Sequence, residues 1–190
     1  MTMLKFSQEV AKAIGNVDPS IVYEIIKISN DRRYIFHGIK RNNSFGSINE
    51  EGVKPLTPEG GWASYWTSGR AIFGSRFNRL ITEDTPFFDY AHSYDFNSNS
   101  LDSMNLAVAN YDCLESKIGI KDSFCIDGYF KIHITVPRDF IHLIRIETKR
   151  IGSDMTERQY GQRKERLLLN SISSVLKKDY KPGGLTLVKT

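Results

Sequence analysis

Helical patterns fill most of the first part of this chain, and strand patterns dominate its last part. The helical patterns cover residues 7–14, 18–28, 44–51, 70–80 and 100–115. The strand patterns cover residues 33–37, 63–67, 129–136, 140–146, 165–169 and 186–188. A parallel sheet with crossover helices needs a regular alternation of strand and helix, which this order lacks. The sequence therefore predicts an α+β fold built from short elements.

Size and hydropathy limit the class of protein. A length of 190 residues predicts one domain, with residues 1–30 as an N-terminal helical extension. A hydrophobic content of 40% excludes a generally disordered chain. No apolar stretch approaches the roughly 20 residues of a membrane span, and the N-terminus lacks the apolar run of a secretory signal. We therefore expect a cytoplasmic protein with no membrane partner, or an effector delivered into a target cell. The sequence does not determine the oligomeric state.

Charge is unevenly distributed along the chain. Residues 83–127 hold 2 basic and 9 acidic side chains, whereas residues 128–190 hold 13 basic and 6 acidic ones. A basic C-terminal third suits an anionic partner such as a nucleotide or a nucleic acid. A solvated surface without any partner has the same composition, so the charge alone does not select a function.

Several well-defined catalytic motifs are absent from the sequence. It holds no Gly-x-x-x-x-Gly-Lys-Ser/Thr phosphate loop, no Gly-x-Gly-x-x-Gly dinucleotide loop, no His-Glu-x-x-His metal motif and no Gly-x-Ser-x-Gly nucleophile elbow. The two cysteines, Cys113 and Cys125, are too few for a four-cysteine zinc site or a disulfide-dense scaffold. No metal site is expected.

One ordered set of short motifs stands out between residues 33 and 77. A strand pattern ends in His37-Gly38, and a short helical pattern follows it and closes in Glu-Gly-Val-Lys-Pro. The next strand pattern carries Tyr65 in Ser-Tyr-Trp-Thr-Ser, and a helical pattern follows that one. In this order the motifs resemble the ADP-ribosyltransferase superfamily, in the His-Tyr-Glu branch of poly-ADP-ribose polymerases and diphtheria-type toxins. The resemblance extends only loosely over residues 128–190.

This resemblance implies a fold and an activity. The implied fold is an ADP-ribosyltransferase-like split mixed/antiparallel β-sheet with flanking short helices. The implied activity is NAD-dependent mono-ADP-ribosylation by a toxin or effector, in which NAD is the substrate and a protein or a nucleic acid is the acceptor. Cleavage of the nicotinamide–ribose bond passes through a sugar cation, as in glycoside hydrolysis, so a carboxylate near that cation stabilises it.

The same resemblance assigns roles to residues of the first motifs. His37 is expected to bind the adenosine ribose of NAD. Gly38 brings its backbone close to the nicotinamide amide, where a side chain would obstruct. Tyr65 stacks on the nicotinamide ring.

Three further residues are expected to contact NAD. Ser68 would add a hydroxyl contact near Tyr65. Arg70, with Arg33 as the alternative, would bind the pyrophosphate, because guanidinium geometry suits phosphate. Phe73 or Phe77 would be the second ring against nicotinamide.

The catalytic carboxylate has three candidates. Glu165 is preferred, because it precedes an apolar run, residues 165–169, that fits a late strand; with Tyr65 and His37 it completes the expected catalytic set. Residues 155–169 also fit one helix, which would place Glu165 on a surface. Glu147 and Asp127 are the other two candidates.

Other functions stay open beside the leading one. A non-catalytic relative would bind NAD or a nucleic acid without releasing nicotinamide. A nucleic-acid-binding domain would use the basic residues 128–190 with Tyr160 and Tyr180, and its binding would depend strongly on salt. An RNA 2′-phosphotransferase is a fourth possibility, but its phosphate-binding residues have no clear positions here. Arg163 stands two residues before Glu165, where arginine-modifying toxins carry a second Glu, so transfer to arginine is disfavoured.

Overall fold

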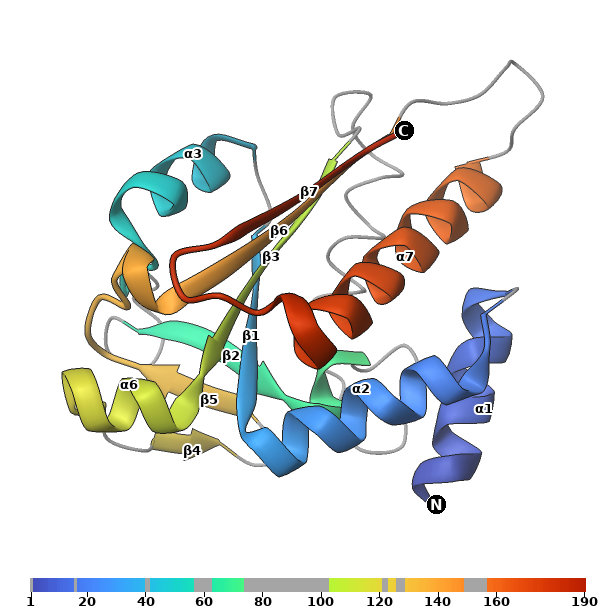
Figure 1. The fold of residues 1–190 in the computed structure, drawn as a ribbon, viewed down its shortest axis with the longest axis horizontal. Helices are drawn as coiled ribbons and strands as arrows, with labels where there is room; N and C mark the ends of the chain where they lie inside the picture. Colours follow the sequence, from blue (N-terminus) through green and yellow to red (C-terminus); the bar gives the residue numbers. More distant parts are fainter. Residues whose placement is uncertain are drawn as a thin grey trace.

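One mixed sheet with helices on both faces forms the described part of the chain (Figure 1). The structure is a computed structural model, and it describes residues 2–15, 17–39, 42–56, 63–73, 103–120, 123–125, 129–148 and 157–190. Seven strands among these residues are hydrogen-bonded in the order β4-β5-β2-β1-β3-β6-β7. The protein is therefore of mixed α/β architecture, with strands that are distant in sequence lying side by side.

The strands are β1 (Tyr34–Ile39), β2 (Ser64–Ser68), β3 (Ser103–Asn110), β4 (Ser123–Cys125), β5 (Tyr129–Ile132), β6 (Ile141–Glu147) and β7 (Leu185–Lys189). The helices are α1 (Met3–Ile14), α2 (Pro19–Arg32), α3 (Asn42–Glu51), α6 (Tyr111–Ile118) and α7 (Glu157–Ser174). Shorter helical turns are η1 (Gly69–Phe73), η2 (Arg138–Phe140) and η3 (Val175–Asp179). Asp18 caps α2 by accepting a hydrogen bond from the Ser20 amide, and Pro19 is its first residue, as the sequence predicts.

The pairing of β1 differs on its two sides. Along its whole length β1 pairs antiparallel with β3, from Tyr34 to Ile39. With β2 it pairs antiparallel only at Ile35 and Phe36. On its other edge β2 pairs antiparallel with β5, from Ser64 to Thr67. The one parallel pair, among the strands described, joins β6 to β7. The end of β1 that carries His37 and Gly38 thus lies beyond its ladder with β2.

Two apolar clusters cover the two faces of the sheet. On one face α1, α2 and α7 pack against Phe36, Val108 and Ile144. On the other face α3 and α6 pack near Ile35 and Trp66. Residues of α1 and α2 are fully buried in the first cluster, so the N-terminal helices are part of the core of this structure.

The predicted helix over residues 100–115 is wrong in its first part. Residues 103–110 form β3, and the helix α6 begins only at Tyr111. The run Leu106 to Ala109 is fully buried, because β3 lies between β1 and β6 and is covered on both faces. A strand that is buried on both faces loses its polar alternation, and periodicity alone does not distinguish it from a buried helix.

The predicted strand over residues 165–169 is also wrong. These residues lie inside α7, a helix of 18 residues, which is not one of the short helices expected. Its apolar residues Leu168, Leu169 and Ile172 are fully buried against the sheet. The apolar residues that suggest a strand in the sequence are instead those with which this helix packs on the sheet.

The remaining strand predictions fare better. The patterns at 33–37, 63–67, 140–146 and 186–188 are confirmed as β1, β2, β6 and β7. The strand predicted for 129–136 stops at Ile132, and Val136 instead forms an isolated bridge with Val53. The predicted helix over 70–80 begins as the 3-10 turn η1, and its residues beyond 73 lie outside the described part. None of the helices in the described ranges is long and apolar enough to cross a membrane.

Candidate functional site

His37 connects β1 to β2 at the point where their ladder ends. Its Nδ1 lies 2.7 Å from the carbonyl oxygen of Tyr65. Because a carbonyl oxygen only accepts hydrogen bonds, Nδ1 carries the hydrogen and donates it. The neutral ring then keeps an acceptor lone pair on Nε2. Burial lowers the pKa of His37 from 6.5, and the bond to Tyr65 opposes that shift only in part. The imidazole is therefore neutral near pH 7.

Trp66 supports this imidazole from the apolar cluster. The His37 and Trp66 rings are tilted against each other, with centroids 5.2 Å apart. The indole N–H of Trp66 donates to the Ser64 hydroxyl at 2.9 Å, and the Trp66 side chain is fully buried. The orientation of the His37 ring is thus defined by a hydrogen bond on one side and a rigid aromatic surface beside it.

Tyr65 and Gly38 lie on the opposite face of the sheet from His37. Successive residues of a strand alternate between faces, and Trp66 belongs to the face of Ile35. Tyr65 therefore shares its face with Phe36, Thr67 and, by the same alternation along β1, Gly38. The structure thus brings the three preferred motif residues to one junction of two strands, with His37 held in the junction itself.

Lys131 is a neighbour of Tyr65 that sequence reasoning did not assign to the site. It pairs with Tyr65 across β2 and β5, and its amino group lies 5.7 Å from the centroid of the Tyr65 ring. The alternating pattern of residues 129–136 places Lys131 on the polar side of its strand. That pattern does not show which strand pairs with β5, so it does not place Lys131 beside Tyr65. A cation beside a half-buried aromatic ring makes a surface that suits an aromatic, anionic ligand.

Arg70 and Phe73 are not brought to His37. Both belong to η1, which follows β2 and packs against α2. The Arg70 guanidinium lies 4.1 Å from the centroid of the Phe6 ring. Phe73 is fully buried and meets the same ring edge-on, at 6.4 Å between centroids. The Arg70 and Phe73 side chains therefore pack in the core around α1. Ser68 is half-buried at the end of β2, where it pairs with Ile35.

The preferred carboxylate, Glu165, lies on α7. Its side chain is 1% exposed, and the adjacent Lys164 is fully buried with its amino group 4.2 Å from the Tyr160 ring centroid. α7 covers the face opposite to the one on which the His37 and Trp66 rings meet. The helix that the sequence left open as an alternative is thus observed, but Glu165 is buried in it rather than on its surface.

The two other candidate carboxylates lie in different surroundings. Glu147 ends β6, where it accepts a hydrogen bond of 2.6 Å from Arg145, and this contact chiefly lowers its pKa. Lys189 also lies 3.6 Å from it. Asp127 lies outside the described residues. The strand that follows it, β5, begins at Tyr129 and pairs with Thr67 of β2.

We expect the protein to lose stability as the pH falls below about 6.5. Burial is the main cause that lowers the pKa of both His37 and His142 from 6.5. The unfolded chain binds protons on these residues before the folded protein does, so the free energy of unfolding decreases as the pH falls from that value. Urea unfolding at about pH 7.5 and about pH 5 measures this.

The choice of these two pH values separates the histidines from the carboxylates. Asp18 and Glu147 have lowered pKa values, and their contributions are lost only near and below 3.8 and 4.5. A His142→Gln variant removes one titrating ring and should show a smaller decrease than the wild type. Equal or greater stability of the wild type at the lower pH contradicts the prediction.

Searches against protein-family models, curated proteins and solved structures each found no match to this chain. In the part of the chain that the structure describes, no group of three or more His, Cys, Asp or Glu side chains is arranged to hold a metal ion.

Proposed function

We propose that this protein is an NAD-dependent mono-ADP-ribosyltransferase that acts on a protein or a nucleic acid. The observation that supports the proposal is the bond of 2.7 Å between His37 and the Tyr65 carbonyl. It joins two residues of the resemblance that lie 28 positions apart, at the junction where β1 leaves β2. The short β1–β2 ladder also fits the split, mixed sheet that the resemblance implies.

Each residue at this junction has a chemical role in the proposal. The Nε2 atom of His37 accepts a hydrogen bond from a ribose hydroxyl. Gly38 presents backbone without a side chain to the nicotinamide amide, and the Tyr65 ring stacks on nicotinamide. Lys131, beside that ring, meets the negative charge of the diphosphate. In this proposal the dinucleotide passes the end of the β1–β2 ladder, so that it meets His37 on one face of the sheet and Gly38 and Tyr65 on the other.

The reaction replaces one bond to the ribose by another. The C1′–nitrogen bond breaks, and nicotinamide leaves as a neutral molecule with the electron pair. A nucleophilic atom of the acceptor forms the new bond to C1′ and loses its proton to solvent or to a base. A carboxylate beside C1′ stabilises the positive charge that develops on the sugar.

Asp127 becomes the leading candidate for this carboxylate in the proposal. It precedes β5 by two residues, and β5 pairs with the strand that carries Tyr65. Glu165 is buried in α7, and Glu147 is engaged with Arg145 on the far side of β3 from β1. Among the three candidates, Asp127 is the one followed by a strand that pairs with β2, and that strand meets Tyr65 at Lys131, four residues after Asp127 in the sequence.

Nicotinamide release from NAD tests the proposal. We expect release by the wild type and a loss of at least about a hundredfold in Tyr65→Ala and Asp127→Asn. Glu147→Gln is the matched carboxylate control, because β3 separates its strand, β6, from β1, and it should keep wild-type release. Loss in Glu165→Gln but not in Asp127→Asn would return the catalytic role to Glu165. A wild type without release, and without a rise in melting temperature on adding NAD, contradicts the proposal.

A non-catalytic NAD- or nucleic-acid-binding module is the second candidate. The location of Glu165 inside a helix favours it, because the residue preferred on sequence grounds is not on a strand of the sheet. This candidate predicts a rise in melting temperature with NAD, or salt-dependent nucleic-acid binding, and no nicotinamide release in the presence of any acceptor.

A further inference from the structure

β7 is the edge strand of the described sheet. It pairs with β6 on one side, and no described strand pairs with its other side. The Leu143 amide donates to the Gly184 carbonyl, and the Thr190 amide donates to the Glu147 carbonyl. In a parallel pair, the residues that bond to the neighbouring strand alternate. The even-numbered residues of β7 therefore face β6, and Leu185, Leu187 and Lys189 direct their backbone N–H and C=O groups away from it.

The side chains of the same residues are exposed. Leu185 is 47% exposed and Leu187 is 46% exposed, and they lie two residues apart on one face of the strand. An edge strand with free backbone groups and exposed apolar side chains is a template for pairing with another extended chain. Among the described strands, β7 combines both features.

The edge is held in place by its connections to the sheet. Arg138 donates to the carbonyl oxygens of Ile141 and Gly184, at 2.6 and 3.0 Å. His142 lies 2.8 Å from the Thr186 hydroxyl through Nε2, and its Nδ1 accepts from the Lys181 amide at 3.1 Å. A pre-organised strand loses little conformational entropy when a second strand pairs with it.

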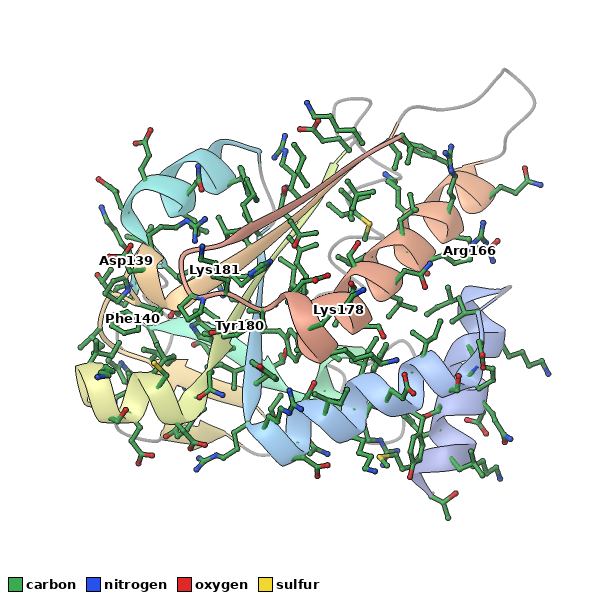
Figure 2. The ribbon with its side chains drawn as sticks, in the orientation of Figure 1. Asp139, Phe140, Arg166, Lys178, Tyr180 and Lys181 are labelled. Atoms are coloured by element: carbon green, nitrogen blue, oxygen red, sulfur yellow. The ribbon has the colours of Figure 1, made fainter. Side chains whose placement is uncertain are left out.

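The charge around this edge is mainly positive. Lys181 lies in the segment that leads into β7, and Lys178 lies in the last helical turn before it (Figure 2). Lys189 is the last residue of β7, with 68% of its side chain exposed. Residues 177–190 hold four lysines and one aspartate. A partner with carboxylates at both ends of the added strand meets this charge, whereas a second copy of β7 brings lysines toward lysines.

We propose that β7 binds an extended acidic segment of another protein by strand addition. Leu185 and Leu187 contact apolar side chains of the added strand, and Lys181 and Lys189 face its carboxylates. This surface is independent of the NAD chemistry proposed above, because it requires neither His37 nor Tyr65.

A labelled peptide of sequence acetyl-Glu-Val-Glu-Val-Glu-Val-Glu-amide is the probe for this site. We expect it to bind the full chain, to weaken as salt increases, and to slow hydrogen exchange of the outward amides of Leu185, Leu187 and Lys189. A peptide with Lys in place of each Glu is the charge control and should bind at least about tenfold more weakly.

Two variants test whether the backbone edge is used. Leu187→Ser removes the apolar side chain and keeps the outward N–H, whereas Leu187→Pro also removes that N–H without removing a bond to β6. We expect weaker binding in the first variant and a greater loss in the second, with both melting near the wild type. If Leu187→Pro unfolds, hydrogen exchange of the outward amides in the wild type, with and without the acidic peptide, still tests whether the backbone edge is used.

Three results would overturn the proposal. They are equal binding of the acidic and basic peptides, binding without protection of the three outward amides, and self-association of the chain through β7 that excludes the acidic peptide. Loss of nicotinamide release in Tyr65→Ala has no bearing on any of them, so failure of the two proposals can be distinguished.

Discussion

Gly52→Ala is expected to lower the free energy of unfolding by about 3 kcal/mol or more. Gly52 follows α3 with φ of 85°, a backbone conformation that costs an L-amino acid about 1–2 kcal/mol. A Cβ atom there would collide with the Val136 carbonyl oxygen and lie 2.8 Å from the Arg138 amide nitrogen. Both are backbone atoms, so no side-chain rotation relieves the contact. Urea unfolding measures the loss.

Gly46→Ala in the same helix is the matched control. Gly46 is exposed in α3, and nothing lies within 4 Å of an added Cβ. Alanine is a better helix former than glycine by about 1 kcal/mol, so this variant should be slightly more stable than the wild type. Equal small effects of the two substitutions would contradict the close packing of Gly52 against the backbone of residues 136–138.

Trp66→Ala is expected to cost about 3–5 kcal/mol of stability, because it empties a fully buried indole site. It also removes the surface on which the His37 ring rests. We therefore expect the titration of His37, followed by NMR of its ring protons, to move back toward that of an ordinary histidine as the cavity admits water. Urea unfolding and the NMR titration check the two effects separately.

Trp66→Phe separates the ring from its hydrogen bond. Phenylalanine keeps an aromatic ring beside His37, but it loses the indole N–H that donates to Ser64 and part of the ring volume in this fully buried site. It should cost less than the alanine variant, about 1–3 kcal/mol, because it leaves the Ser64 hydroxyl without its donor and opens only a small cavity. A Trp66→Ala variant as stable as the wild type would show that Trp66 does not anchor the junction.

Short elements with clear boundaries are those that the sequence predicts correctly. Asp18 and Pro19 mark the start of α2, and Gly52 marks the end of α3, because capping and turn residues act over a few positions. The predictions for residues 103–110 and 165–169 are wrong for the opposite reason. Both are apolar runs whose burial is set by neighbours far away in the sequence, so the local pattern carries no information about their conformation.

The candidate site shows the same division. The positions of His37 and Gly38 on one strand and of Tyr65 on another are predictable from their own segments. The local pattern around Arg70 and Phe73 gives no sign of Phe6, which lies far away in the sequence and packs against both. Spacing in the sequence likewise gives no sign that Lys131 lies beside Tyr65, because the pairing of β2 with β5 makes them neighbours.

The sequence by itself determined the approximate positions of most short helices and strands. Only the tertiary structure decided that β1 leaves β2 after Phe36, that the His37 imidazole binds the Tyr65 carbonyl there, and that Glu165 is buried in a helix. Local order follows from backbone preferences of adjacent residues. Strand order follows from burying the apolar surface of the whole chain at once, and that requirement has no local signature.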